Sequence, residues 1–70
     1  MNYCSRGLAW SLKKEYDIAI IDYDEAIRLE PKLALAYHNR GIAWLAKGQY
    51  DRAIKDFDQA IRLNPNDALA

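Results

Sequence analysis

The sequence predicts an all-α fold made of two tandem helix–turn–helix units, which together form a fragment of an α-solenoid. The first observation is a repeat: shifted by 34 residues, the sequence matches itself without a gap, and 20 of the 36 aligned pairs are identical. The second is the spacing of apolar residues, which recur three and four positions apart, as in an amphipathic helix. The third is a proline after the last apolar turn of each unit, where a helix is expected to end.

The repeat organises the chain as a single domain over residues 1–70. Unit one covers about residues 1–33 and unit two covers residues 34–67. Residues 68–70 repeat the opening of unit two and are interpreted as the start of a truncated third unit. A domain of this size is near the lower limit at which a hydrophobic core is stable on its own.

The second helix of the first unit is marked by an apolar stripe and closed by Pro31. The stripe consists of Tyr16, Ala19, Ile20, Tyr23, Ala26 and Ile27. The helix before it ends near Lys14, which stands where the second unit has Gly48. Glycine adopts the left-handed conformation that follows many helices without strain, whereas lysine adopts it only at a cost. This first turn therefore either carries backbone strain or uses another geometry.

The second unit predicts helices over residues 35–47 and 50–63. The first of them contains no proline and ends at Gly48, and the second is stopped by Pro65. Gly41 lies inside the first helix, where glycine costs up to about 1 kcal/mol relative to alanine. Its recurrence at the same place in both units predicts that the two helices of a unit cross closely there.

The spacing of these residues resembles the tetratricopeptide repeat, a family with the same period. The second unit carries the pattern at Tyr37, Arg40, Gly41, Trp44, Ala53, Phe57, Ala60 and Pro65, and the first unit carries it at Tyr3, Gly7, Trp10, Ala19, Tyr23, Ala26 and Pro31. The resemblance implies a right-handed superhelix whose first helices line a concave groove. It also implies the leading function, a non-enzymatic scaffold that binds a partner protein or a peptide in that groove.

The resemblance also implies which residues line the groove. They are Cys4, Leu8, Ser11 and Leu12 from the first unit, and Leu35, His38, Asn39, Ile42 and Leu45 from the second. This set is mostly apolar, so it favours an apolar or mixed peptide over a strongly charged one. The alternative is that several of these residues only pack against neighbouring helices.

One subset of the family holds the C-terminal carboxylates of chaperones in a clamp of lysines, asparagines and an arginine. Only Asn39 matches that clamp in this sequence. Its lysine and first asparagine positions carry Cys4, Leu8, His38 and Ile42 instead. We therefore do not expect the chain to bind chaperone tails.

The sequence departs from the family at Arg6 and Arg40, where the family usually has leucine. An arginine that is buried there needs a carboxylate partner. The nearest supply is the set of aspartates on the second helices: Asp22, Asp24, Asp56 and Asp58. The hypothesis is an internal ladder of ion pairs, in which Arg40 reaches one of these carboxylates.

Composition and motifs argue against several other functions. Ten basic and ten acidic residues cancel, so nothing favours nucleic acid or an anionic membrane as a partner. No catalytic motif or phosphate loop occurs, and we expect neither an enzyme nor a cofactor. Cys4 and His38 occupy equivalent positions, but a metal site would need two more ligands and none is in register, so this reading is remote. The single cysteine says little about compartment, and a cytoplasmic location is only a default.

The rival function is self-assembly, in which the main partner is another copy of the chain. Terminal units of a solenoid normally carry a polar cap, and the last helix here has none. Its open face would be covered by a further unit of a longer array or by another copy. In addition, Ile18 and Ile21 stand where the second unit has Arg52 and Lys55, which is either harmless exposure or an interface patch. The residues expected to contribute to self-association are Ile18, Ile21, Phe57, Ala60, Ile61 and Leu63.

Overall fold

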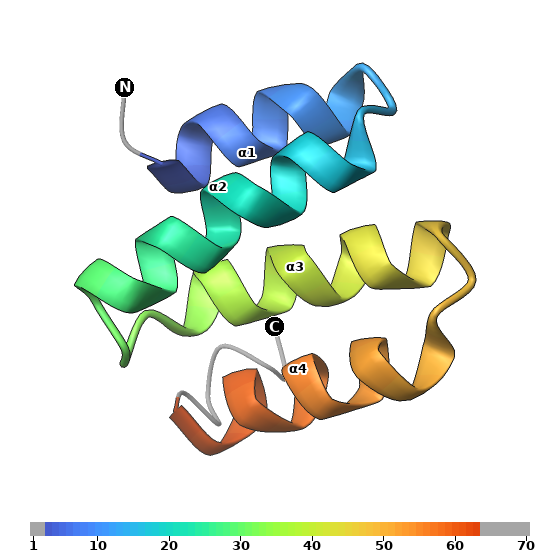
Figure 1. The fold of residues 1–70 in the computed structure, drawn as a ribbon. Helices are drawn as coiled ribbons and strands as arrows, with labels where there is room; N and C mark the ends of the chain where they lie inside the picture. Colours follow the sequence, from blue (N-terminus) through green and yellow to red (C-terminus); the bar gives the residue numbers. More distant parts are fainter. Residues whose placement is uncertain (1–2, 64–70) are drawn as a thin grey trace.

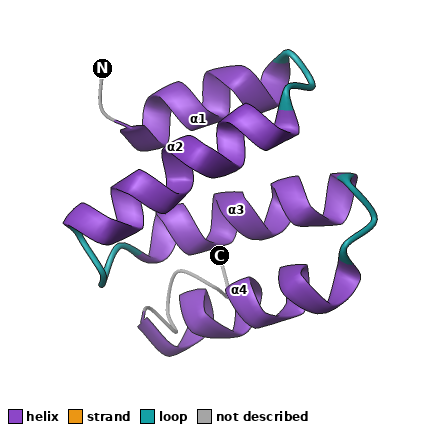
Figure 2. Ribbon diagram, viewed as in Figure 1, coloured by secondary structure: helices purple, strands orange, loops and turns teal. Residues whose placement is uncertain are grey.

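The computed structural model describes the backbone of residues 3–63 and the side chains from Arg6 onwards, and this part of the chain forms four helices (Figure 1). They are α1 (Tyr3–Leu12), α2 (Tyr16–Leu29), α3 (Ala34–Ala46) and α4 (Tyr50–Leu63). Short loops join them, and no strand occurs between residues 3 and 63 (Figure 2). The predicted all-α pair of hairpins is confirmed, and the helices of the second unit lie within one residue of the predicted bounds. None of the four is long and apolar enough to cross a bilayer.

The helices are stacked in the order of the chain. Each helix packs against the next one, and α1 also contacts α3. Figure 1 shows α1 and α4 at the two opposite ends of this stack. The core lies where the two hairpins meet, and its buried members are Ala19, Ile20, Tyr23, Ala26, Ala36 and Ala43. The hairpins are therefore held together by the junction between α2 and α3.

Each hairpin closes around a helix-interior glycine. A Cβ added to Gly41 would lie 2.8 Å from Cε1 of Phe57, and one added to Gly7 would lie 2.7 Å from Cε1 of Tyr23. Both distances are shorter than carbon atoms tolerate, so an aromatic ring of the second helix occupies the space that the missing side chain leaves. This confirms the predicted close crossing and explains why the same position is glycine twice.

The two hairpin turns share one geometry although their residues differ. Gly48 has a φ of 80° and Lys14 has a φ of 64°, both in the left-handed region. In each turn the next backbone N–H donates to a carbonyl near the end of the preceding helix: Glu15 to Trp10 at 2.9 Å, and Gln49 to Trp44 at 2.9 Å. Of the two alternatives for the first turn, the strained one is realised. A non-glycine residue in this conformation costs about 1 kcal/mol.

Candidate interaction faces

The arginines that depart from the family pattern form ion pairs inside their own hairpins. Arg6 donates from Nε (3.2 Å) and Nη2 (2.8 Å) to the carboxylate of Asp22. Arg40 donates from the same two atoms to Asp56, at 2.8 Å and 2.7 Å. Both aspartates are buried. The hypothesis of an internal ladder is confirmed, and the bidentate geometry compensates the cost of burying each carboxylate.

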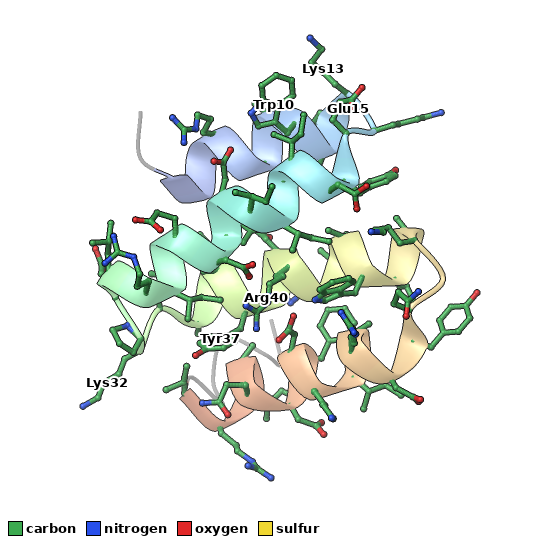
Figure 3. All side chains as sticks on the ribbon, in the orientation of Figure 1. Trp10, Lys13, Glu15, Lys32, Tyr37 and Arg40 are labelled. Atoms are coloured by element: carbon green, nitrogen blue, oxygen red, sulfur yellow. The ribbon has the colours of Figure 1, made fainter. Side chains whose placement is uncertain are left out.

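Arg40 makes a further contact that joins the two hairpins. Its Nη1 donates to Oδ1 of Asp24 on α2 at 2.7 Å, and its guanidinium lies 5.4 Å from the centre of the Tyr37 ring. Figure 3 shows Arg40 and Tyr37 together on α3. The hydrogen bond to Asp56 raises the pKa of Arg40 above its ordinary value, burial opposes the shift, and the hydrogen bond to Asp24 adds to it. Arg40 therefore acts as a permanently charged clamp between α2, α3 and α4.

A second ion pair crosses the same junction nearer the hairpin turns. Lys47, at the end of α3, pairs with Asp17 in the first turn of α2. Its ammonium also lies 5.5 Å from the centre of the Trp44 ring. The junction between α2 and α3 thus combines a small-residue core with one ion pair toward each end.

The residues predicted to line the groove lie on the first helix of each hairpin, and these two helices contact each other. We call the described ones the A-helix face: Leu8, Ser11, Leu12, Leu35, His38, Asn39, Ile42 and Leu45. Cys4 belongs to α1, but its side chain lies outside the described residues. All five aliphatic members of the face are exposed.

The polar members of the A-helix face are more involved in the fold. Ser11 is half-buried, with its hydroxyl oxygen 3.4 Å from that of Tyr23. Asn39 is also half-buried. His38 is exposed, and its ring centre lies 5.6 Å from that of Phe57 on α4. The contacts of Ser11 and His38 and the burial of Asn39 are consistent with the alternative reading, in which some of these residues serve packing.

The structure exposes an apolar face at the end of the stack, which we call the α4 end face: Tyr50, Ile54 and Ile61. Their equivalents in the first unit are Tyr16, Ile20 and Ile27, which belong to the core or pack against it. Ile20 is 6% exposed and Ile54 is 56% exposed, although the repeat places them identically. The difference arises because α3 packs against α2, whereas no further described helix packs against α4.

The composition of this face differs from the sequence-based expectation. Ile61 is exposed as expected, but Ala60 is only 7% exposed, and Phe57 is half-buried with its ring on Gly41. Leu63 is half-buried as well. Ala60 and Phe57 face the interior of their own hairpin, since α3 lies there. Sequence reasoning missed Tyr50 and Ile54. The repeat did offer a signal, since the next hairpin covers the matching residues of α2.

The remaining predicted patch lies on the outer side of α2. Ile18 and Ile21 are both exposed and stand about one helical turn apart. In the second unit the position of Ile18 is taken by Arg52, whose guanidinium lies 4.9 Å from the centre of the Trp44 ring. No group of three or more histidine, cysteine, aspartate or glutamate side chains that could hold a metal ion occurs in the described part of the chain.

Two protein-family models match the sequence. The model of the family described as tetratricopeptide repeat matches residues 34–67, and a second model, described as TPR repeat, matches residues 12–48. The second match covers more than half of the chain and spans the junction between the hairpins. No curated protein matches the sequence.

Proposed function

The chain belongs to the tetratricopeptide repeat family, and we propose that it binds an apolar peptide segment of a partner protein on the A-helix face. Repeats of this family generally serve as protein–protein interaction modules, and their fold is typically a non-enzymatic scaffold. The proposal adds the surface and the kind of ligand.

The observation that carries the proposal is the exposure of aliphatic side chains on one side of α1 and α3. Leu8, Leu12, Ile42 and Leu45 are all exposed, and none of them belongs to the buried core. Because α1 contacts α3, a single ligand can reach both helices. Burying such side chains against a ligand contributes roughly 25 cal/mol for each Å² removed from water.

The chemistry of the face supports an apolar ligand. No aspartate, glutamate, lysine or arginine belongs to the A-helix face, so a strongly charged peptide would find no ionic partner among these residues. His38, which is exposed, offers a hydrogen bond beside the aliphatic residues. We therefore expect the ligand to carry several aliphatic or aromatic side chains with few charges.

A displayed library of random peptides tests the proposal without a known partner. The 70-residue chain is used as bait, and enriched peptides are measured again with an Ile42→Glu variant and an Ile54→Glu variant. Ile42 lies on the A-helix face, and Ile54 is a matched exposed isoleucine on α4. We expect apolar peptides whose affinity falls at least tenfold with Ile42→Glu and stays unchanged with Ile54→Glu. Peptides that bind both variants like the parent chain would refute the proposal.

The exposed α4 end face supports a second candidate function, self-association. Of the equivalent residues in the first hairpin, Ile20 is buried and Tyr16 and Ile27 are partly buried against the core at the junction with the second hairpin. Light scattering on a sizing column over a wide concentration range would test this function. A mass that rises above 8.1 kDa with concentration is the expected result, and a mass that stays at 8.1 kDa would exclude it.

A further inference from the structure

We propose that a second copy of the chain covers the α4 end face with the outer side of its own α1, so that copies join head to tail. This inference rests on the second proposed function, self-association, and adds its register. The contact would repeat the junction that α2 and α3 already form inside one chain, with α4 in the place of α2 and α1 of the next copy in the place of α3.

The apolar residues that such a contact needs are present at both ends of the stack. Inside the chain, Ala43 of α3 is completely buried against α2, with Trp44 packed beside it. The equivalent residues of α1 are Ala9 and Trp10, and Ala9 is exposed. Ala9 would cover Ile54 of the neighbouring copy, much as Ala43 helps to cover Ile20. A small residue at this place lets the two helices approach closely.

The charges of the junction recur at the two ends in the same register. Arg40 pairs with Asp24 across the internal junction, and Lys47 pairs with Asp17. Shifted by one repeat, these pairs become Arg6 with Asp58 and Lys13 with Asp51. Both aspartates of α4 are exposed. All four charges that the head-to-tail contact would use are therefore present with the correct sign.

The ion pair that Arg6 makes inside its own hairpin is compatible with this second role. Arg40 holds Asp56 through Nε and Nη2 while its Nη1 donates to Asp24. Arg6 holds Asp22 through the same two atoms, Nε and Nη2. One arginine at this position can thus serve its own hairpin and the neighbouring one together.

The placement of α1 and α4 at opposite ends of the stack makes the contact heterologous. Figure 3 shows Lys13 pointing away from the other helices, whereas Trp10 is partly buried and packs against the core, as Trp44 does. Two α4 end faces that met each other would bring together Asp51 and Asp58 of both copies without the basic residues of α1. A head-to-tail contact leaves a free α1 at one end of every open assembly and a free α4 end face at the other, so the average mass should keep rising with concentration beyond that of a dimer.

The decisive test uses two charge reversals that complement each other only in this register. In a Lys13→Glu variant, the introduced carboxylate would face Asp51 of the next copy, and in an Asp51→Lys variant two ammonium groups would face each other. Each variant alone should associate about three- to tenfold more weakly than the parent chain, as expected for replacing one surface pair by a repulsive one. An equimolar mixture of the two should regain the parent association. When unlike copies meet, Lys13 of one faces Asp51 of the other, or the introduced glutamate faces the introduced lysine, and both pairs have opposite charges.

Two further variants separate the proposal from its competitors. Ile54→Glu should weaken association at least tenfold and leave the unfolding midpoint of the monomer unchanged. Ile21→Glu, on the outer side of α2, should change neither the association nor the midpoint. If Ile54→Glu unfolds the monomer, the α4 end face is covered by the chain itself and the inference is overturned. If Ile21→Glu breaks the assembly instead, the contact lies on α2.

The outcomes distinguish the inference from the function on which it rests. If the parent chain stays monomeric at every concentration, both self-association and the head-to-tail register are refuted. A parent chain that associates, with no rescue when the two charge variants are mixed, keeps self-association and overturns the head-to-tail register.

Discussion

Replacing Asp56 by alanine tests the role of the buried ion pairs most sharply. Asp56 is buried and accepts two hydrogen bonds from Arg40, whose side chain is 21% exposed. Removing the carboxylate leaves this guanidinium largely desolvated, with Asp24 as its remaining carboxylate partner among the contacts described above. Breaking a buried ion pair by removing one partner typically costs about 3–5 kcal/mol. Because Arg40 keeps Asp24 and some access to water, we expect a loss of about 2 kcal/mol.

Asp22→Ala is the matched control in the first hairpin. Asp22 is as buried as Asp56, but the side chain of its partner Arg6 is 50% exposed and can be hydrated when the carboxylate is removed. We expect a smaller loss, about 1 kcal/mol. The contrast between the two variants therefore measures how much burial of the arginine contributes.

Urea unfolding followed by circular dichroism is the assay. A loss of about 2 kcal/mol should lower the midpoint by roughly 1–2 M urea for a domain of this size. The double variant Arg40→Leu, Asp56→Leu should recover most of the loss, since an apolar pair of similar volume can replace a buried ion pair at little cost. An Asp56→Ala variant within about 0.5 kcal/mol of the parent, or no more affected than Asp22→Ala, would refute the reasoning.

Three other changes have defined outcomes. Gly41→Ala should destabilise the fold by about 1 kcal/mol in the same urea assay, because the added Cβ would clash with the Phe57 ring. The free-energy cost of this clash should exceed the gain in helix propensity. Lys14→Gly should stabilise it by about 0.5–1 kcal/mol, since it relieves the left-handed strain; an unchanged midpoint would contradict this. The hydrogen bond from Arg28 lowers the pKa of Glu25, so its contribution exists above the ordinary carboxyl pKa and is lost as the pH falls. In an Arg28→Gln variant, NMR titration should find the pKa of Glu25 raised toward its ordinary value.

The fold was predictable from the sequence because the same residue pattern occurs in both units. A helix period, a stopping proline and a helix-interior glycine at matching positions leave few other arrangements for the chain. The kind of partner that Arg6 and Arg40 bind was also predictable, because a buried arginine would need a carboxylate and the second helix of each unit supplies one. Only Arg40 is largely buried, since the side chain of Arg6 is half exposed.

The details that sequence reasoning missed depend on which side of a helix has a neighbour. The repeat treats Ile20 and Ile54 as equivalent, but only the first is covered, because α3 follows α2 in the stack. Ala60 has a small side chain that points toward α3, so it was wrongly grouped with the open face. Asp24 was among the predicted partners of Arg40, but that Arg40 holds Asp24 and Asp56 together follows only from the relative position of the two hairpins.

The candidate binding residues could be predicted only through the resemblance to the family. Periodicity places Leu8 and Ile42 on a helix, but it does not say which side of the helix a ligand would use. The structure adds that the aliphatic members of the A-helix face are exposed, while Ser11 and Asn39 are half-buried. Which of them contacts a ligand stays a prediction.

If the exposed aliphatic side chains of α1 and α3 form the binding face, NMR shift mapping should locate a bound peptide on them. A peptide enriched from the displayed library is titrated into the ¹⁵N- and methyl-labelled chain. We expect the largest shift changes at Leu8, Leu12, Ile42 and Leu45, with Ile54 and Ile61 of α4 unaffected. Shift changes centred on the α4 end face or on Ile18 and Ile21 would contradict the claim and move the binding site to another surface.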